Sequence, residues 1–214
     1  MRRTEKKRGS GGEQERERVS LSPSLPLTVS LFLLVLLAAC AAPATLKGTD
    51  LGKTPAPDFK LTDQTGQATS LADFRGKVVV LTFLYTHCPD ECPLIASKLA
   101  TTSGLLGDNT MNQTAFVAVS VDPINDTPMA IARFVQDHHL VGKLHYLTGT
   151  PAQLTPVWSA YSVYAAASVS TSSGSVSHST RVILIDQAGN ERINFDSDLD
   201  PNDLAFDVRA LLNE

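Results

Sequence analysis

The sequence predicts an α/β sandwich organised around one central mixed sheet, and three observations support this prediction. Apolar runs of strand length recur along the chain at 78–85, 115–121 and 182–186. Each run is apolar at nearly every position, which is typical of strands that are buried on both faces. Segments with helical spacing of apolar residues separate the runs, so strands and helices alternate.

The first elements of the domain are predicted to be a small hairpin and one helical turn. Residues 63–66 (DQTG) have the composition of a tight turn between two short β-prone stretches. Ser70 stands three residues before Asp73, which is the spacing of a capped helical turn. The expected positions are strands at 59–61 and 67–69 and a helical turn at 71–74.

The helix after the first buried run is predicted to begin at a cysteine motif and to end near residue 106. Thr127-Pro128 and Asp200-Pro201 each place a capping side chain directly before a proline, which favours a helix start. Pro156 lies inside a further helical stripe, Leu154 to Tyr161, and predicts that this helix kinks or starts late. The remaining elements are expected to be strands at 144–147 and 191–195 and a final helix at 201–212.

The chain closes with a strand, a turn, a second strand and a helix, and this order predicts a thioredoxin-like sheet. In a sheet of this kind the strand 182–186 runs antiparallel to 78–85. The start of one strand therefore meets the end of the other. Ligand sites of such sheets lie beyond the carboxyl end of a central strand, where residues 86–93 fall.

A separate segment precedes this domain. Residues 1–18 are polar, with seven Lys or Arg and four Glu, and an uncharged stretch follows that ends in LTVSLFLLVLLAAC, Leu27–Cys40. This apolar run is shorter than the roughly 18–20 residues that a membrane-spanning helix needs, and it ends in small residues, as a secretory signal does. A short membrane anchor is the alternative.

The end of this run, Leu37-Ala38-Ala39-Cys40, resembles the lipobox of bacterial lipoproteins, in which the cysteine is diacylated and becomes the first mature residue. We therefore expect a lipoprotein-type signal peptide at 1–39, a lipidated tether at 40–57 and the folded domain at 58–214. The protein is then expected at the cell membrane, on its extracytoplasmic face, held by the lipid on Cys40.

Removal of residues 1–39 changes the charge balance. The whole chain has 18 basic and 22 acidic residues, and the mature part keeps 11 and 18 of them, a formal net charge of about −7. No basic stripe remains, which argues against nucleic acid as a partner. With Cys40 assigned to the lipid, Cys88 and Cys92 form a lone pair in a compartment where disulfides can form.

The motif FLYTHCPDECP at 83–93 carries the clearest chemistry of the sequence. Pro93 suits the first position of a helix, which makes Cys92 the predicted N-cap and leaves Cys88 in a tight turn before it. A helix N-terminus favours thiolate over thiol, so both sulfurs are expected to ionise readily. The pair can be a structural disulfide, a redox catalyst or a metal clamp.

Two absences weaken the hypothesis of a redox catalyst without removing it. Thioredoxin-type oxidoreductases space their cysteines by two residues, whereas three separate Cys88 from Cys92. They also place a cis-proline before the strand equivalent to 182–186, and the sequence has no proline between Val157 and Asp200. The hypothesis of a structural disulfide is weak as well, because the bond would close too short a loop to stabilise the fold by much.

In place of that proline stands His178, at the end of a Ser/Thr/Ala-rich stretch and directly before the strand 182–186. The predicted antiparallel order brings the start of this strand, and with it His178, to Cys88 and Cys92. Two thiolates and one imidazole suit copper, since sulfur selects Cu(I) and an imidazole with an open fourth position tolerates Cu(II). Structural zinc sites have four closed ligands, and the sequence offers no convincing fourth.

With these residues in place, the sequence resembles the Sco/SenC family of copper chaperones for cytochrome c oxidase assembly. The resemblance extends over about residues 57–212, nearly the whole mature domain. The motifs that carry it occur in the family's order and are FLYTHCPDECP at 83–93, SVDPINDTP at 120–128 and SHSTRVILID at 177–186.

The resemblance implies a metal carrier rather than a turnover enzyme. It implies that Cys88, Cys92 and His178 bind one copper ion, for the binuclear copper centre of cytochrome c oxidase subunit II or a related cuproprotein. Asp122 matches an aspartate near the family's copper site, and it is either a neighbour of the metal or a turn-former before Pro123. The alternative function is a thiol–disulfide oxidoreductase that reduces the cysteines of exported cuproproteins.

Overall fold

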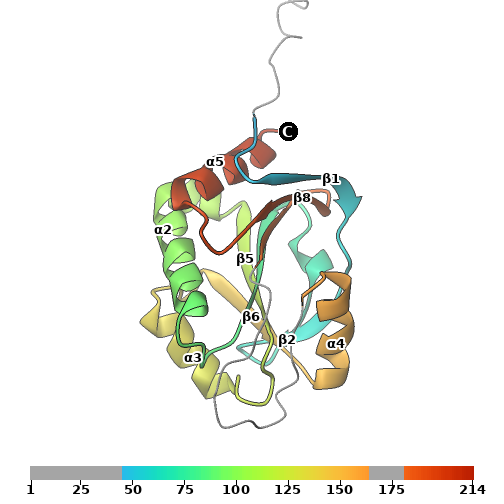
Figure 1. Ribbon diagram of the computed structural model, residues 1–214, viewed down its shortest axis with the longest axis vertical. Coiled ribbons are helices and arrows are strands. Elements are labelled where there is room, and N and C mark those ends of the chain that lie inside the picture. Colours follow the sequence, from blue (N-terminus) through green and yellow to red (C-terminus); the bar gives the residue numbers. More distant parts are fainter. Residues whose placement is uncertain (1–44, 164–180) are drawn as a thin grey trace, which may run out of the picture. The chain divides into compact units, whose positions relative to one another are not determined.

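The computed structural model of the protein describes residues 45–163 and 181–214. Within these residues one mixed sheet of eight strands forms the centre of the domain, in the order β1-β8-β7-β4-β5-β6-β2-β3 (Figure 1). The strands are β1 (Thr49–Pro55), β2 (Lys60–Asp63), β3 (Ala68–Ser70), β4 (Val78–Leu84), β5 (Thr114–Ser120), β6 (Leu144–Thr148), β7 (Val182–Ile185) and β8 (Asn190–Phe195). The helices are the 3₁₀ turn η1 (Leu71–Phe74), α2 (Glu91–Met111), α3 (Pro128–Asp137), α4 (Pro151–Ala160) and α5 (Pro201–Leu212).

Helices cover both faces of the sheet. α2, α3 and α5 lie on one side and α4 lies on the other (Figure 1). α2 and α5 pack against each other on their side. The layers are therefore helix, sheet and helix, and the predicted α/β sandwich with a central mixed sheet is confirmed.

The pairing of β4 fixes where the ends of the central strands lie. β4 runs parallel to β5, with Val80 opposite Phe116, and antiparallel to β7, with Thr82 opposite Val182. The carboxyl end of β4 therefore lies beside the start of β7. The predicted antiparallel order of these two strands is confirmed.

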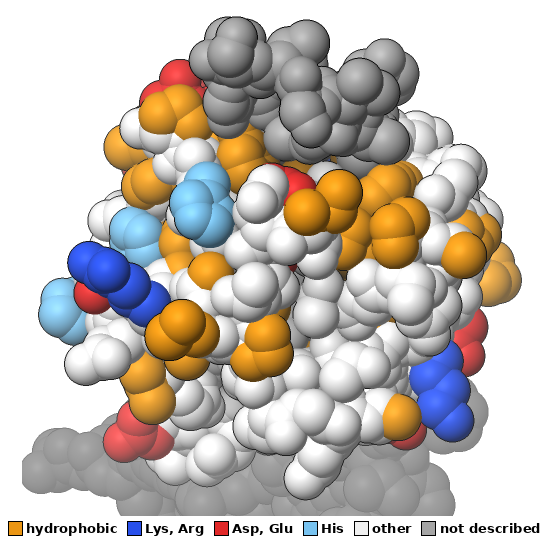
Figure 2. Space-filling view, turned by 90° about the horizontal axis from the view of Figure 1, so that it is seen from below, with side chains coloured by type: hydrophobic (Ala, Val, Ile, Leu, Met, Phe, Trp, Pro, Cys, Tyr) orange, Lys and Arg blue, Asp and Glu red, His pale blue; other side chains and the backbone are white. Residues whose placement is uncertain are grey.

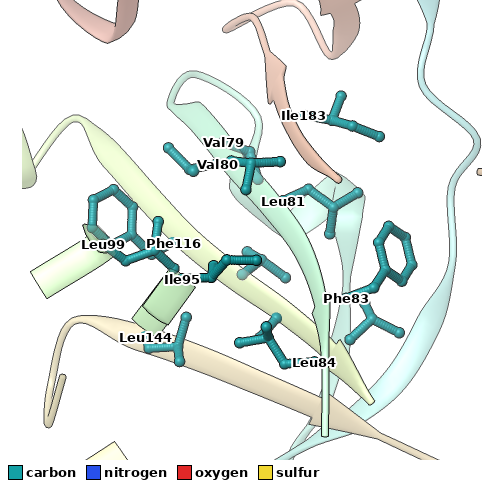
Figure 3. Close-up of a cluster of buried hydrophobic side chains, with 14 of the residues drawn as sticks. Val79, Val80, Leu81, Phe83, Leu84, Ile95, Leu99, Phe116, Leu144 and Ile183 are labelled. Carbon is teal, nitrogen blue, oxygen red and sulfur yellow. The ribbon is translucent and has the colours of Figure 1, made fainter. Parts of the chain in front are cut away.

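β4 forms the middle of the hydrophobic core, since every one of its residues is buried. Figure 3 shows how Ile95 and Leu99 of α2 and Phe116 of β5 gather next to this strand. Burial of one such side chain contributes about 1.5–3 kcal/mol. The cluster therefore holds α2, and with it the cysteine motif, against the sheet.

Most predicted elements are confirmed, and each of the strands β2 to β8 starts and ends within two residues of its predicted bounds. The caps predicted at Ser70, Thr127 and Asp200 are confirmed as well. The Asp73 carboxylate accepts a hydrogen bond from the Ser70 amide at 2.7 Å, and Thr127 Oγ1 accepts one from the Ala130 amide at 3.2 Å. Side-chain caps thus define both helix starts, as their sequences indicate.

Part of the predicted tether is folded. Thr49–Pro55, which lie within 40–57, form β1 and pair antiparallel with β8. Just before this strand, the amides of Lys47 and Gly48 donate to the Asp207 carboxylate at 2.9–3.0 Å. The side chains of β1 are largely exposed, so no apolar pattern marks the strand in the sequence. The folded domain therefore begins before residue 58.

Two helices differ from their predicted bounds. α2 continues beyond residue 106 across a break at Gly107, whose φ of 72° suits glycine best. α4 begins at Pro151 rather than late, with Pro156 inside it. The reason is a reciprocal cap, in which Thr150 Oγ1 accepts from the Gln153 amide and the Gln153 side chain accepts from the Thr150 amide.

Three predictions concern residues outside the described ranges: the signal peptide at 1–39, the lipidated Cys40 and the ligand His178. Between 45 and 163 and from 181 onward, no helix is both long and apolar enough to cross a membrane.

Truncation of a core side chain of α2 should destabilise the whole domain. Leu99 is fully buried, so Leu99→Ala is expected to lower the free energy of unfolding by about 2–5 kcal/mol. The matched control is Leu94→Ala in the same helix, because Leu94 is 59% exposed and its loss should cost no more than about 0.5 kcal/mol. Urea unfolding measures both, and equal effects would contradict the packing described.

Candidate metal centre

The two cysteines lie at the carboxyl end of β4, where α2 begins. The strand ends at Leu84, and the cysteine loop, defined here as residues 85–92, follows it and includes the first two residues of the helix. Cys88 is 8% exposed and Cys92 is fully buried. The loop therefore lies where α/β sheets place their ligand sites, as predicted.

The first turn of α2 differs from its prediction. Asp90 rather than Cys92 is the N-cap, and its carboxylate accepts a hydrogen bond from the Glu91 amide at 2.7 Å. Cys92 and Pro93 are the second and third residues of the helix. Amides at these positions have no acceptor inside a helix, so the missing N–H of Pro93 costs little and the Cys92 amide bonds outside the helix.

The sulfurs of the two cysteines are close together. The Cys92 amide donates to Cys88 Sγ at 3.3 Å, and a hydrogen bond links the two thiols. The Cys88 sulfur also lies 3.8 Å from Asp90 Oδ1. Both cysteines are reduced in the structure. Two thiols in this arrangement can bind one soft metal ion or can close a disulfide after oxidation.

Burial keeps the Cys92 thiol protonated. Loss of hydration raises the pKa of Cys92 well above its usual value, and the neighbouring Cys88 and Asp126 add to the rise, whereas a backbone hydrogen bond with Tyr85 opposes it. The expectation that the helix N-terminus makes both cysteines ionise readily is therefore wrong for Cys92, because burial outweighs the helix dipole. A metal ion that binds this sulfur must displace a proton.

Asp126 is a buried carboxylate that holds the cysteine loop. Its side chain is only 2% exposed, and it accepts hydrogen bonds from the Thr86 amide at 2.8 Å, the Ser120 hydroxyl at 2.6 Å and the Tyr146 hydroxyl at 3.0 Å. Burial raises the pKa of Asp126, and these hydrogen bonds oppose the rise. The sequence places Asp126 within SVDPINDTP, but only the fold shows that it contacts the loop.

Asp122 forms the turn between β5 and α3. Its carbonyl accepts hydrogen bonds from the amides of Asn125 and Asp126 at 3.2 and 2.9 Å. Its buried side chain accepts a further bond from the Asn125 side-chain amide at 2.8 Å. These contacts account for Asp122 as a turn-former, and a role beside a metal stays a prediction.

A groove of about 710 Å³ lies beside the cysteine loop. Two residues that flank the cysteines, His87 and Pro93, form one wall, and α3 contributes to the other. Figure 2 views this end of the molecule, where histidine and hydrophobic side chains lie next to one another. Met129 is 81% exposed there and Ile124 is 68% exposed. Neither cysteine lines the groove, so it is an open surface adjacent to the pair.

Arg181 is the first described residue after position 163, and it lies at the same end of the sheet as the cysteines. Its carbonyl accepts a hydrogen bond from Thr82 Oγ1 at 2.9 Å, and its guanidinium donates to Asn194 Oδ1 and to the Tyr161 carbonyl. His178 precedes it by three residues and is not among the described residues. In the part of the chain that is described, no three His, Cys, Asp or Glu side chains are grouped so that they could hold a metal ion.

Comparison with known proteins gives a consistent result. The model of the SCO1/SenC family matches residues 48–213. The mitochondrial SCO2 homolog of Bos taurus is 41% identical over 108 residues, which are 50% of this chain and 40% of that protein. The SCO2-like protein of Rickettsia prowazekii is 28% identical over 149 residues, which are 68% of this chain and 71% of that protein. The chain thus spans less than half the length of the bovine relative.

Solved structures of similar proteins share the fold. ScoI of Bradyrhizobium japonicum with copper bound superposes with a TM-score of 0.66 at 30% identity, over 74% of this chain and 100% of that chain. ScoI of Arabidopsis thaliana with copper bound gives 0.66 at 28% identity, over 75% and 100%. Apo Sco1 of Thermus thermophilus gives 0.69 at 27% identity, over 80% and 100%. Homologous structures have therefore been solved with copper.

Binding of Cu(I) to the pair should release protons, because Cys92 is held as a neutral thiol. The apparent Cu(I) affinity is expected to rise from about pH 6 to about pH 8, by roughly tenfold per pH unit for each proton displaced. Competition with a Cu(I) chelator of known pH dependence measures this slope. Cys92→Ser is the matched control, and the dependence of its affinity on pH should be smaller by the part that one displaced proton contributes. A parent affinity that is independent of pH would contradict the protonated state of Cys92.

Proposed function

The chain belongs to the SCO1/SenC family, and from this premise we propose that it is a copper carrier. In this proposal Cys88 and Cys92 bind one copper ion and His178 completes the site. The protein delivers or prepares copper for the binuclear copper centre of cytochrome c oxidase subunit II or a related cuproprotein. The observation that carries the proposal is the contact between two thiols at the end of β4, in a fold whose relatives are solved with copper bound.

The donor atoms at the end of β4 suit Cu(I). Thiolate sulfur is a soft ligand, which favours Cu(I) over the hard cations that prefer carboxylate and water oxygens. The Cys92 amide already donates to Cys88 Sγ, and this bond orients the sulfur and stabilises negative charge on it. Burial of both side chains excludes water from the sulfurs. The pair is therefore suited to hold a monovalent, soft ion.

Chain connectivity supports His178 as the third ligand. Arg181 is fixed beside Thr82, and the strand that contains Thr82 ends two residues later at Leu84, where the cysteine loop begins. Three residues of chain span at most about 11 Å. The chain that follows His178 therefore enters the sheet, at Arg181, at the same end as the cysteines.

A site with three protein ligands suits transfer better than storage. It leaves one coordination position open, and a ligand of the acceptor can enter there before the carrier's ligands leave. When another disulfide oxidises Cys88 and Cys92 and leaves as two thiols, the new Cys88–Cys92 disulfide removes two of the three ligands and releases the ion. The thiol pair thus provides both the binding site and a means of emptying it.

The proposal includes the location of the protein. The short apolar run that ends at Cys40 has the pattern of a lipoprotein signal. In this proposal the lipid on Cys40 anchors the chain at the extracytoplasmic face of the cell membrane, where the copper site meets its exported acceptor.

The same thiol contact also supports a second candidate function, reduction of a disulfide in an exported cuproprotein. In that reaction the Cys88 sulfur, the more exposed of the two, attacks the target disulfide and forms a mixed disulfide. Cys92 then displaces the target, which leaves with both of its thiols and two electrons, and the Cys88–Cys92 disulfide remains. The neutral state of Cys92 slows the second step, so the carrier function is favoured.

Anaerobic titration of the reduced chain with Cu(I) in the presence of a competing chelator tests the proposal. One tightly bound ion per chain is expected. Cys88→Ser and Cys92→Ser should each lower the affinity by at least about 100-fold, and His178→Ala by about 10- to 100-fold, because each change removes a ligand or leaves a weaker one.

His139→Ala is the matched histidine control, since His139 is exposed in the turn after α3, and it should bind as the parent does. Absence of tight copper in the parent would reject the carrier. Unchanged affinity in His178→Ala would reject the third ligand. Fast reduction of a target disulfide that needs both cysteines, in a parent without tight copper, would favour the second function.

A further inference from the structure

We propose that Asp126 is the positioning residue of the copper site, because its carboxylate fixes the cysteine loop in the geometry that binds copper. The inference rests on the proposed function. It adds a residue that acts through the backbone of the loop rather than on the ion.

The carboxylate of Asp126 divides its hydrogen bonds between the loop and the sheet. Oδ1 accepts from the amide of Thr86, which lies two residues before Cys88. Oδ2 accepts from the hydroxyls of Ser120, the last residue of β5, and Tyr146 in β6. One side chain therefore joins the cysteine loop to two neighbouring strands, at the end of β5 and in the middle of β6.

The partners of Oδ2 are fixed parts of the core. Ser120 and Tyr146 are both fully buried. The Tyr146 ring also packs edge-to-face against Phe134 of α3, with 6.1 Å between the ring centres. The amide of Asp126 itself donates to the Asp122 carbonyl at 2.9 Å. The two hydroxyls and the backbone bond thus fix the position of the carboxylate, and the carboxylate in turn fixes the position of the loop.

Thr86 lies at the point where the chain leaves the sheet. The carbonyl of Leu84 still accepts a hydrogen bond from the Val121 amide beside it, at 3.0 Å. Farther along, the Cys88 amide donates to the Tyr85 carbonyl at 3.4 Å, a contact within the loop itself. The bond from Thr86 to Asp126 instead ties the loop to a side chain 40 positions away in the sequence.

The hydrogen bond between Thr86 and Asp126 affects the free energy of copper binding because it restricts the motion of the loop that carries the cysteine ligands. A chelating pair binds more tightly when its donor atoms are already held in place, because less conformational entropy is lost on binding. Groups that orient metal ligands typically contribute about 10–100-fold to the affinity. The same tie favours the disulfide of the metal-free pair, since it holds the two sulfurs near each other.

Asparagine at position 126 can keep the hydrogen bond to the Thr86 amide, whereas alanine cannot. The side-chain oxygen of asparagine can accept from the Thr86 amide, and its NH₂ group can donate to the oxygens of the Ser120 and Tyr146 hydroxyls. Asp207 provides the matched control. It is another fully buried carboxylate, and it accepts from backbone amides of Lys47 and Gly48 before β1.

The test measures Cu(I) affinity of the full chain by chelator competition in the parent, Asp126→Ala, Asp126→Asn and Asp207→Ala. Asp126→Ala should weaken binding by about tenfold or more, and Asp126→Asn should restore it to within about threefold of the parent. Asp207→Ala should lower the unfolding midpoint as Asp126→Ala does but bind copper as the parent does. Parent-like affinity in Asp126→Ala would overturn the inference, as would equal losses in Asp126→Ala and Asp207→Ala.

A measurement without copper separates this inference from the proposed function. In glutathione buffer the two thiols and oxidised glutathione exchange to give the Cys88–Cys92 disulfide and two reduced glutathiones. The equilibrium constant should fall by about threefold or more in Asp126→Ala but not in Asp207→Ala. Absence of tight copper binding in the parent would reject the carrier function, but the exchange equilibrium constant would still test the role of Asp126. An equilibrium constant that is unchanged in Asp126→Ala would overturn the inference.

If Asp126→Ala does not fold, the double variant Ser120→Ala/Tyr146→Phe replaces it. That variant keeps the contact of Asp126 to Thr86 but removes both hydroxyls that hold the carboxylate. Weaker Cu(I) binding than in the parent is expected, and parent affinity in this variant would overturn the inference.

Discussion

The antiparallel pairing of β4 with β7 is the constraint on which the site depends. Because Thr82 lies opposite Val182, the end of one strand and the start of the other share an edge of the sheet. The cysteine loop leaves from the first strand, and the chain that follows His178 enters the second. A parallel pairing would put them at opposite ends of the sheet. The topology thus brings the cysteine loop and the start of β7, about ninety residues apart in the sequence, to one edge of the sheet.

At this edge of the sheet, burial of Cys92 lowers the reactivity of its thiol as a nucleophile. The Cys92 side chain is fully buried, which keeps its thiol neutral and makes it a poor nucleophile. A soft cation can reverse this state, since it replaces the proton and neutralises the thiolate that forms. These properties support the proposed exchange of a proton for a metal ion more than repeated attack on disulfides. Asp126 holds the loop through a backbone amide, so in the proposed site both sulfurs stay available to the ion.

Local patterns in the sequence predict those parts of the structure that local forces determine. The apolar runs give β4, β5 and β7, and the pairs Thr127-Pro128 and Asp200-Pro201 give the starts of α3 and α5. β1 is not predictable in this way, because it is an exposed edge strand defined by its pairing with β8. The protonated Cys92 and the contact from Asp126 to Thr86 depend on tertiary packing, which no spacing of residues shows. His178 stays a prediction from the order of the strands and the family resemblance.

X-ray absorption at the copper edge of the Cu(I)-loaded full chain tests the proposed site most directly, because it counts the donor atoms around the ion. Two sulfur neighbours and one nitrogen neighbour are predicted for a site made by Cys88, Cys92 and His178. A shell of nitrogen and oxygen alone would contradict the role of the thiol pair, and a shell of sulfur alone would contradict the role of the histidine.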